Sequence, residues 1–114
     1  MSTSCIFCRI AAKDVPATLV HEDDEVVAFR DLSPQAPTHI LVIPRRHVAS
    51  LDETVEADTE LLGRMMRVAR RVAAQDGLTH GYRVVTNNGA GAGQSVLHLH
   101  LHVLGGRPLS WPPG

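Results

Sequence analysis

Three histidines alternate with aliphatic residues near the C-terminus, in the run His98-Leu99-His100-Leu101-His102-Val103-Leu104. In a β-strand, residues i, i+2 and i+4 point to the same side, about 6.5 to 7 Å apart along the row. The run therefore predicts a strand with three imidazoles on one face, while Leu97, Leu99, Leu101 and Val103 face a core. Imidazole changes charge near neutral pH and also binds metals, so this face is the chain's first candidate for chemistry.

Three functions suit such a row of imidazoles. A neutral imidazole can attack phosphorus and form a covalent intermediate that water then hydrolyses. Two histidines at i and i+2, with a third ligand, can instead bind zinc and activate a water molecule. A third alternative is a metal-sensing or proton-sensing module without catalysis.

A glycine-rich segment, residues 87–95, comes directly before the histidine run. Glycines 89, 91 and 93 allow the backbone to approach a ligand closely and to turn its N–H groups toward an anion. Gln94 and Ser95 add side-chain donors beside it. The segment has no Gly-Lys-Ser/Thr ending and precedes a strand, so it is neither a P-loop nor a dinucleotide fingerprint. Its position favours phosphate as the group on which the histidines act.

A second cluster of potential ligands lies at the N-terminus, where Cys5 and Cys8 are separated by two residues. This spacing is typical of half a zinc site or of a redox pair. Thioredoxin-type redox motifs follow a strand and open a helix, whereas only four residues precede Cys5. The zinc interpretation is therefore the stronger one.

The remaining patterns predict the elements that must position these groups. Apolar spacing from Ile6 to Ala11 indicates a short helix, and that from Asp58 to Asp76 a long one, with Asp58 as N-cap and Gly77 as C′ residue. Strands are expected at Leu19 to Glu22, Val26 to Arg30, His39 to Ile43 and Tyr82 to Thr86, besides the histidine run. The long helix thus follows three strands and precedes two. Short connections favour an α+β fold, in which a five-stranded antiparallel sheet is covered on one face by the long helix.

Length and charge exclude several classes. The 114 residues predict a single domain, residues 1–114, and a net charge of −1 argues against nucleic acid as a partner. Four arginines of the long helix, Arg64, Arg67, Arg70 and Arg71, are expected to form a solvated face. No apolar stretch approaches the roughly 20 residues of a membrane span, and the N-terminus has no export pattern. We therefore expect a cytoplasmic protein without a membrane partner.

The histidine run resembles the His-φ-His-φ-His-φ-φ signature of the histidine triad (HIT) superfamily, where φ is an apolar residue. The segment from Ser33 to His39 is similar to the family's loop before its central strand. Gly93-Gln94-Ser95-Val96 and the ending Trp111-Pro112-Pro113-Gly114 resemble the Hint branch, the histidine triad nucleotide-binding proteins. His102 stands where the dinucleotide-hydrolase and nucleotidyltransferase branches have glutamine, which favours phosphoramidase chemistry.

This resemblance implies a HIT-like fold in which two subunits of a homodimer join their sheets into one ten-stranded sheet. It also implies a purine nucleoside phosphoramidate hydrolase that cleaves the P–N bond of AMP or GMP conjugates through a nucleotidyl-histidine intermediate. No cofactor is required for such catalysis. The alternative is a nucleotide-binding scaffold or regulatory protein with little turnover.

The resemblance also implies roles for individual residues. His100 would be the nucleophile, His102 would bind the phosphate and assist proton transfer, and Ser95 would contact the leaving group. His39 and His98 would orient the nucleophile. The expected nucleotide contacts are Asp31 at the ribose, Ile6, Phe7, Phe29 and Leu32 at the base, and Asn87 and Gly93 at the phosphate. Trp111 would reach toward the partner's site.

The cysteine pair adds a further implication. Cys5-Ile6-Phe7-Cys8 resembles bacterial relatives that hold a structural zinc, for which His47 and His98 would be the other ligands. A Cys₂His₂ set suits zinc. His98 would then serve the active site, the metal, or both.

Overall fold

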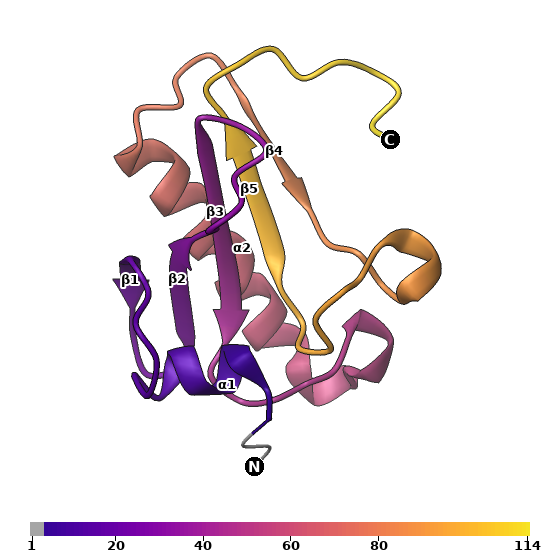
Figure 1. Cartoon of the computed structure of the whole chain (residues 1–114). Helices are drawn as coiled ribbons and strands as arrows, with labels where there is room; N and C mark the ends of the chain where they lie inside the picture. Colours follow the sequence, from indigo (N-terminus) through magenta and orange to yellow (C-terminus); the bar gives the residue numbers. More distant parts are fainter. Residues whose placement is uncertain (1–3) are drawn as a thin grey trace.

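The computed structural model describes residues 4–114 and has the predicted order of elements. A short helix and three strands precede a long helix, and two strands follow it (Figure 1). The elements are α1 (Ile6–Ala11), β1 (Leu19–Glu22), β2 (Val26–Arg30), β3 (Thr38–Pro44), α2 (Thr59–Gln75), β4 (Tyr82–Val85) and β5 (Leu101–Gly105). Three single-turn 3₁₀ helices lie in the connections: η1 (Leu51–Glu53), η2 (Glu56–Asp58) and η3 (Ala90–Ala92).

The strands form one antiparallel sheet in the order β1-β2-β3-β5-β4, which confirms the predicted fold class. Helix α2 covers one face of this sheet and α1 lies across the end of the other (Figure 1). Side chains of β2 and β3 alternate between two cores, so Ile40 and Val42 pack toward α2 while Leu41 and Ile43 pack toward α1. The same alternation places His39 and His102 on the α1 face.

Helix α2 packs through the predicted apolar stripe, whose buried members are Met65, Val68, Ala69, Val72 and Ala73. Met66 is also apolar but lies off the buried stripe and is 51% exposed. Asp58 holds the N-cap position, yet its side chain caps no amide of α2 and instead accepts the Val55 N–H and pairs with Arg46. Gly77 ends the helix with a φ of +74°, as expected of a C′ glycine.

The histidine run is only partly a strand, because β5 begins at Leu101 rather than at His98. The partner strand β3 ends at Pro44, which has no N–H to continue the ladder. Beyond this point the Leu99 N–H donates to the Val48 carbonyl instead, at 2.6 Å. Leu99, Leu101 and Val103 face the core as expected, but Leu97 is 66% exposed. The three imidazoles are therefore not equivalent.

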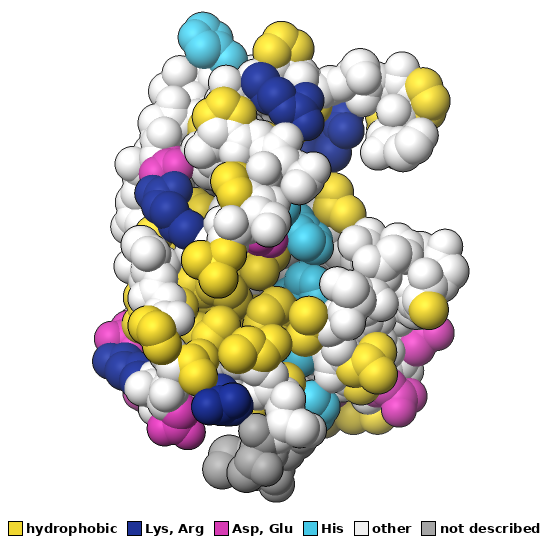
Figure 2. Space-filling view, viewed as in Figure 1, with side chains coloured by type: hydrophobic (Ala, Val, Ile, Leu, Met, Phe, Trp, Pro, Cys, Tyr) yellow, Lys and Arg dark blue, Asp and Glu magenta, His cyan; other side chains and the backbone are white. Residues whose placement is uncertain are grey.

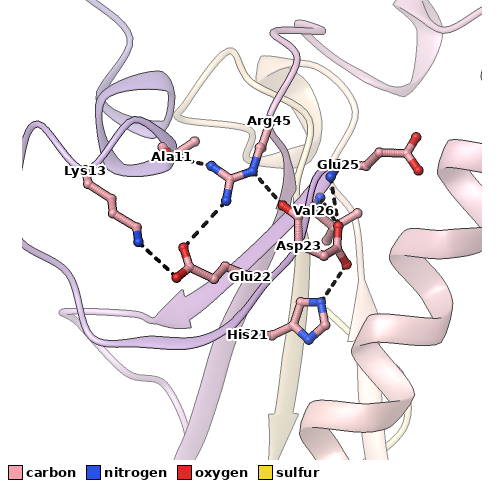
Figure 3. Close-up of polar contacts among 8 residues, drawn as sticks. All are labelled: Ala11, Lys13, His21, Glu22, Asp23, Glu25, Val26 and Arg45. Carbon is pink, nitrogen blue, oxygen red and sulfur yellow. Dashed lines mark hydrogen bonds and ion pairs between the residues drawn. The ribbon is translucent and has the colours of Figure 1, made fainter.

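A polar cluster fixes α1 against the β1–β2 hairpin (Figure 3). The Asp23 carboxylate accepts the N–H groups of Glu25 and Val26, both at 2.8 Å, which explains a tight turn without glycine. The Arg45 guanidinium donates to the carbonyls of Asp23 and Ala11, at 2.6 and 2.7 Å. Because Ala11 is the last residue of α1, Arg45 ties this helix to the sheet.

Candidate active site

His100 and His102 border a pocket of about 250 Å³ between α1, β2, β3 and the loop before β5. In Figure 2, histidine side chains line a hollow beside a patch of hydrophobic side chains. The pocket is lined by Ile6, Phe7, Ile10, Pro16, Ala17, Phe29, Arg30, Asp31, Leu32, Leu41, Ser95, Val96, His100 and His102. The lining thus combines apolar side chains with two imidazoles, one carboxylate, one hydroxyl and the Arg30 guanidinium.

The backbone fixes which nitrogen of His100 is free. Its Nδ1 lies 2.6 Å from the carbonyl oxygen of His98, which can only accept, so Nδ1 carries the proton. In the neutral ring Nε2 then holds the lone pair. The ring is 6% exposed and is packed against the edge of Phe7, with centroids 5.1 Å apart. His100 therefore presents a single lone-pair nitrogen, which is what a nucleophilic imidazole requires.

A chain of hydrogen bonds makes Nε2 of His102 a donor, whereas Nε2 of His100 holds a lone pair. The Gln35 N–H donates to Nδ1 of His39 at 3.0 Å, so His39 carries its proton on Nε2. That N–H donates to Nδ1 of His102 at 2.8 Å, which places the proton of His102 on Nε2. Among residues 4–114 this buried Nε2 has no hydrogen-bond partner. It is a donor available for an anion bound beside His100, because both rings line the pocket.

The rings of His39 and His102 are neutral at neutral pH. Burial, together with the nearby rings of His100 and His39, lowers the pKa of His102 to about 4. Burial also lowers the pKa of His39, although the Asp31 carboxylate opposes that shift. Asp31 Oδ2 lies 3.5 Å from Nε2 of His39, and Oδ1 accepts the Ser33 N–H at 2.7 Å. Asp31, His39 and His102 have ligand atoms that lie within 4.8 Å of one another, as in a metal site. The hydrogen bond between the two rings, however, already uses Nε2 of His39 and Nδ1 of His102.

The imidazole of His98 points away from the pocket, toward the cysteines. Its Nε2–H donates to the Pro44 carbonyl at 2.8 Å, which leaves the Nδ1 lone pair facing the sulfurs. Nδ1 lies 3.3 Å from Cys5 Sγ and 3.6 Å from Cys8 Sγ, and His47 Nδ1 lies 3.3 Å from Cys8 Sγ. The four donor atoms lie within 4.8 Å of one another. Two sulfurs and two ring nitrogens so placed fit a tetrahedral zinc ion.

The Cys8 thiol is protonated at neutral pH when no metal is bound. Burial and the neighbouring Cys5 raise the pKa of Cys8 to about 11. Metal binding requires the thiolate and releases this proton. His98 thus places its ring against the cysteine cluster, while its carbonyl accepts a hydrogen bond from Nδ1 of His100.

The structure brings most of the expected site residues together. Ile6, Phe7, Phe29, Asp31, Leu32, Ser95, His100 and His102 line the pocket, whereas Asn87 and Gly93 do not. Gln94 offers no free donor, because its amide accepts the Gly89 N–H and donates to the carbonyls of Ala49 and Val96. It closes the glycine-rich loop upon itself. The glycine-rich backbone therefore contributes less to the pocket than its composition suggested.

Several lining residues were not anticipated. Ile10 lies one turn from Ile6 and Phe7, and Leu41 lies two residues from His39 on the same strand face, so periodicity alone would have found both. Pro16 and Ala17 carry no such signal. Trp111, expected to reach toward the partner's site, is 82% exposed in the single chain. Its C-terminal segment runs away from the sheet (Figure 1).

Within residues 4–114, no helix combines the length and the apolar character needed to span a membrane.

Comparisons with known proteins agree on one family. The HIT domain model matches residues 12–109. An uncharacterized HIT-like protein of Synechococcus elongatus is 52% identical over all 114 residues of both chains. A 14 kDa zinc-binding protein of Zea mays is 51% identical over 111 residues, which are 96% of this chain and 87% of the maize protein. The crystal structure of a HIT family hydrolase from Legionella pneumophila superposes with a TM-score of 0.95, at 49% identity, over 97% of this chain and 100% of the other.

Proposed function

The chain belongs to the HIT domain family, and on this premise we propose that it is a hydrolase of the Hint branch that cleaves the P–N bond of purine nucleoside phosphoramidates. One observation carries the proposal. A lone-pair nitrogen of His100 and an unpartnered N–H of His102 line the same pocket, beside a carboxylate and an apolar wall. That pairing of a nucleophile with an anion donor suits attack on a phosphoryl group.

The reaction follows from these two nitrogens. Nε2 of His100 attacks the α-phosphorus, and the P–N bond breaks as the leaving nitrogen takes a proton that the Ser95 hydroxyl relays from water, and departs as an amine. His102 Nε2–H stabilises the phosphoryl oxygen where negative charge develops. Water then attacks the phosphorus and gives up a proton to the solvent, which balances the proton taken by the amine, while the bond to Nε2 breaks. The nucleoside monophosphate leaves with its lone pair returned to Nε2 of His100.

Different lining residues of the pocket contact the ribose and the base of the nucleotide. Asp31 accepts hydrogen bonds from the ribose hydroxyls, and the purine packs between α1 and β2, against Phe7 and Phe29. AMP and GMP conjugates are the substrate class. Leu32 lies at the mouth of the pocket and is 95% exposed, so a bound base would cover it.

Two structural elements complete the proposal. Cys5, Cys8, His47 and His98 hold a structural zinc, a proposal supported by their geometry and by the maize relative's name. Strand β4 pairs only with β5, so its outer edge can join the β4 of a second copy and form a ten-stranded sheet. In that homodimer Trp111 reaches the partner's site.

The test is turnover of a fluorogenic adenosine phosphoramidate. We expect multiple turnovers that release AMP and free amine in equal amounts. A scaffold or regulatory protein would bind AMP in a parallel titration and yet release no amine beyond the uncatalysed rate. That second result would overturn the proposed activity while leaving nucleotide binding in place.

The low pKa of His102 predicts a loss of stability in mild acid. A histidine whose pKa is about 4 in the folded state and about 6.5 in the unfolded state makes unfolding take up a proton between these values. Its contribution is therefore present above pH 6.5 and is lost as the pH falls toward 4. We expect this ring to lower the free energy of unfolding by about 1–2 kcal/mol between pH 6.5 and 4. This is less than the full pKa shift would give, because water screens a half-buried charge.

Urea unfolding at several pH values between 7 and 4 measures this dependence. His102→Gln keeps a side-chain N–H donor but does not titrate, so its unfolding free energy should fall less steeply over this range. Equal slopes for the two proteins would contradict the neutral state assigned to His102.

A further inference from the structure

A carboxylate stands at the C-terminal end of α2, where the helix dipole disfavours negative charge. This residue, Asp76, is held by three hydrogen bonds. Arg30 donates Nη2–H to Oδ1 at 2.7 Å and Nη1–H to Oδ2 at 3.1 Å, and the Thr38 hydroxyl donates to Oδ2 at 2.6 Å. The pairing with Arg30 and the bond from Thr38 keep the pKa of Asp76 below its usual value. The hydrogen bonds to Arg30 and Thr38 therefore offset the unfavourable position of this carboxylate at the helix end.

Both partners of Asp76 adjoin residues of the candidate active site. Arg30 immediately precedes Asp31, and Thr38 immediately precedes His39. They end β2 and begin β3, on either side of the loop of residues 31–37. The Asp31 N–H donates to the His39 carbonyl at 2.9 Å across the base of this loop. Asp76 thus holds both ends of the loop from outside the pocket.

The loop sets the hydrogen-bond chain that ends at His102. Its Gln35 N–H fixes the tautomer of His39, and His39 in turn fixes that of His102. The Gln35 carbonyl accepts from Arg107 at 3.2 and 3.0 Å, so the loop is held at its middle as well. A displacement of the loop ends would lengthen the bond from Gln35 to His39 and move the Asp31 carboxylate at the same time.

We propose that Asp76 is a positioning residue for the hydrolysis, which acts through Arg30 and Thr38 to hold Asp31 and His39 in register with the nucleophile. The inference rests on the proposed function, because it assigns the ribose to Asp31 and the phosphate to His102. Asp76 touches neither substrate nor reacting atoms. Its ion pair with Arg30 is partly exposed, with 41% and 22% of the two side chains accessible, and exposed pairs add little to folding stability. Misplacement of catalytic groups by 1 Å, in contrast, costs about 100-fold in rate.

Thr38→Val is the sharpest test. Thr38 is 5% exposed, and valine keeps its shape and favours the strand while it removes the hydroxyl that bonds Asp76. We expect kcat to fall by about 10-fold to 100-fold and the Kd for AMP to rise by about threefold or more. Thr38→Ser retains the hydroxyl and should restore both values to within about twofold of the wild type. Glu25→Gln, which breaks the ion pair between Glu25 in the β1–β2 turn and Arg64 of α2, should change neither value.

The ¹⁵N chemical shifts of the imidazoles separate positioning from general weakening of the fold. In the wild type we expect His39 to be protonated at Nε2 and His102 at Nε2, and in Thr38→Val we expect both rings to move toward mixed tautomers. The proposal is overturned if Thr38→Val loses turnover with unchanged ring shifts, if Thr38→Ser fails to restore turnover, or if Thr38→Val behaves as the wild type. Should the wild type not cleave phosphoramidates, the proposed function fails, and the ring shifts with AMP affinity still decide the role of Asp76.

Discussion

His100→Ala should lose about 10⁴-fold or more in kcat for an adenosine phosphoramidate, because the nitrogen that forms the covalent bond to phosphorus is gone. AMP affinity should change little, since Asp31, Phe7, Phe29 and the His102 N–H remain in the pocket. The ring of His100 packs on Phe7, so a small loss of stability accompanies the change. Steady-state kinetics and calorimetric titration with AMP measure the two effects separately.

His80→Ala is the matched control for this experiment. His80 is an exposed histidine in the connection before β4, outside the nucleotide pocket, and its removal should leave kcat unchanged. A His100→Ala protein that keeps wild-type turnover would contradict the assignment of the nucleophile. A parallel loss in His80→Ala would show that the assay reports folding rather than chemistry.

The second large effect is expected from the proposed zinc site of Cys5, Cys8, His47 and His98. Cys5→Ser together with Cys8→Ser removes both sulfur ligands. A metal ion present at about 1,000 times its Kd stabilises the folded state by about 4 kcal/mol, so the double variant should lose about this much free energy of unfolding. The same change should weaken AMP binding. The cysteines lie at the start and within the first turn of α1, and the residues between them, Ile6 and Phe7, line the pocket. Thermal unfolding and AMP titration, with and without stoichiometric zinc, check both effects.

Elemental analysis provides the direct control for that prediction. Protein purified without added metal should contain one zinc per chain, and the double variant should contain none. His21→Ala removes a histidine that pairs with Asp23 outside this cluster and should keep the full zinc content. Wild-type protein without zinc, whose stability a chelator does not change, would contradict the structural metal.

Most of the fold was predictable because its signals are local. The apolar period of α2, the glycine at its C′ position and the alternation in β5 each specify an element from neighbouring residues. The start of β5 was misplaced because it depends on Pro44, a residue of the partner strand that cannot extend the ladder. The turn at Asp23 forms without glycine, because the Asp23 carboxylate accepts two backbone hydrogen bonds that stabilise it.

The site was less predictable because backbone groups arrange it. The His98 carbonyl sets the reactive nitrogen of His100, and the Gln35 N–H sets the tautomers of His39 and His102. Backbone carbonyls and amides occur at nearly every position, so no residue type signals their role. The separation of His98 from the pocket likewise follows from its bond to the Pro44 carbonyl, which strand alternation alone does not reveal.

In the proposed reaction, His100 forms a covalent bond to the nucleotide during turnover. Mass spectrometry of protein quenched within the first turnovers on an adenosine phosphoramidate tests it most directly. We expect a species heavier by one AMP moiety in the wild type, with the added mass on the peptide that contains His100, and no such species in His100→Ala. Wild-type protein that turns over substrate without this species, or His100→Ala protein that still forms it, would contradict the account.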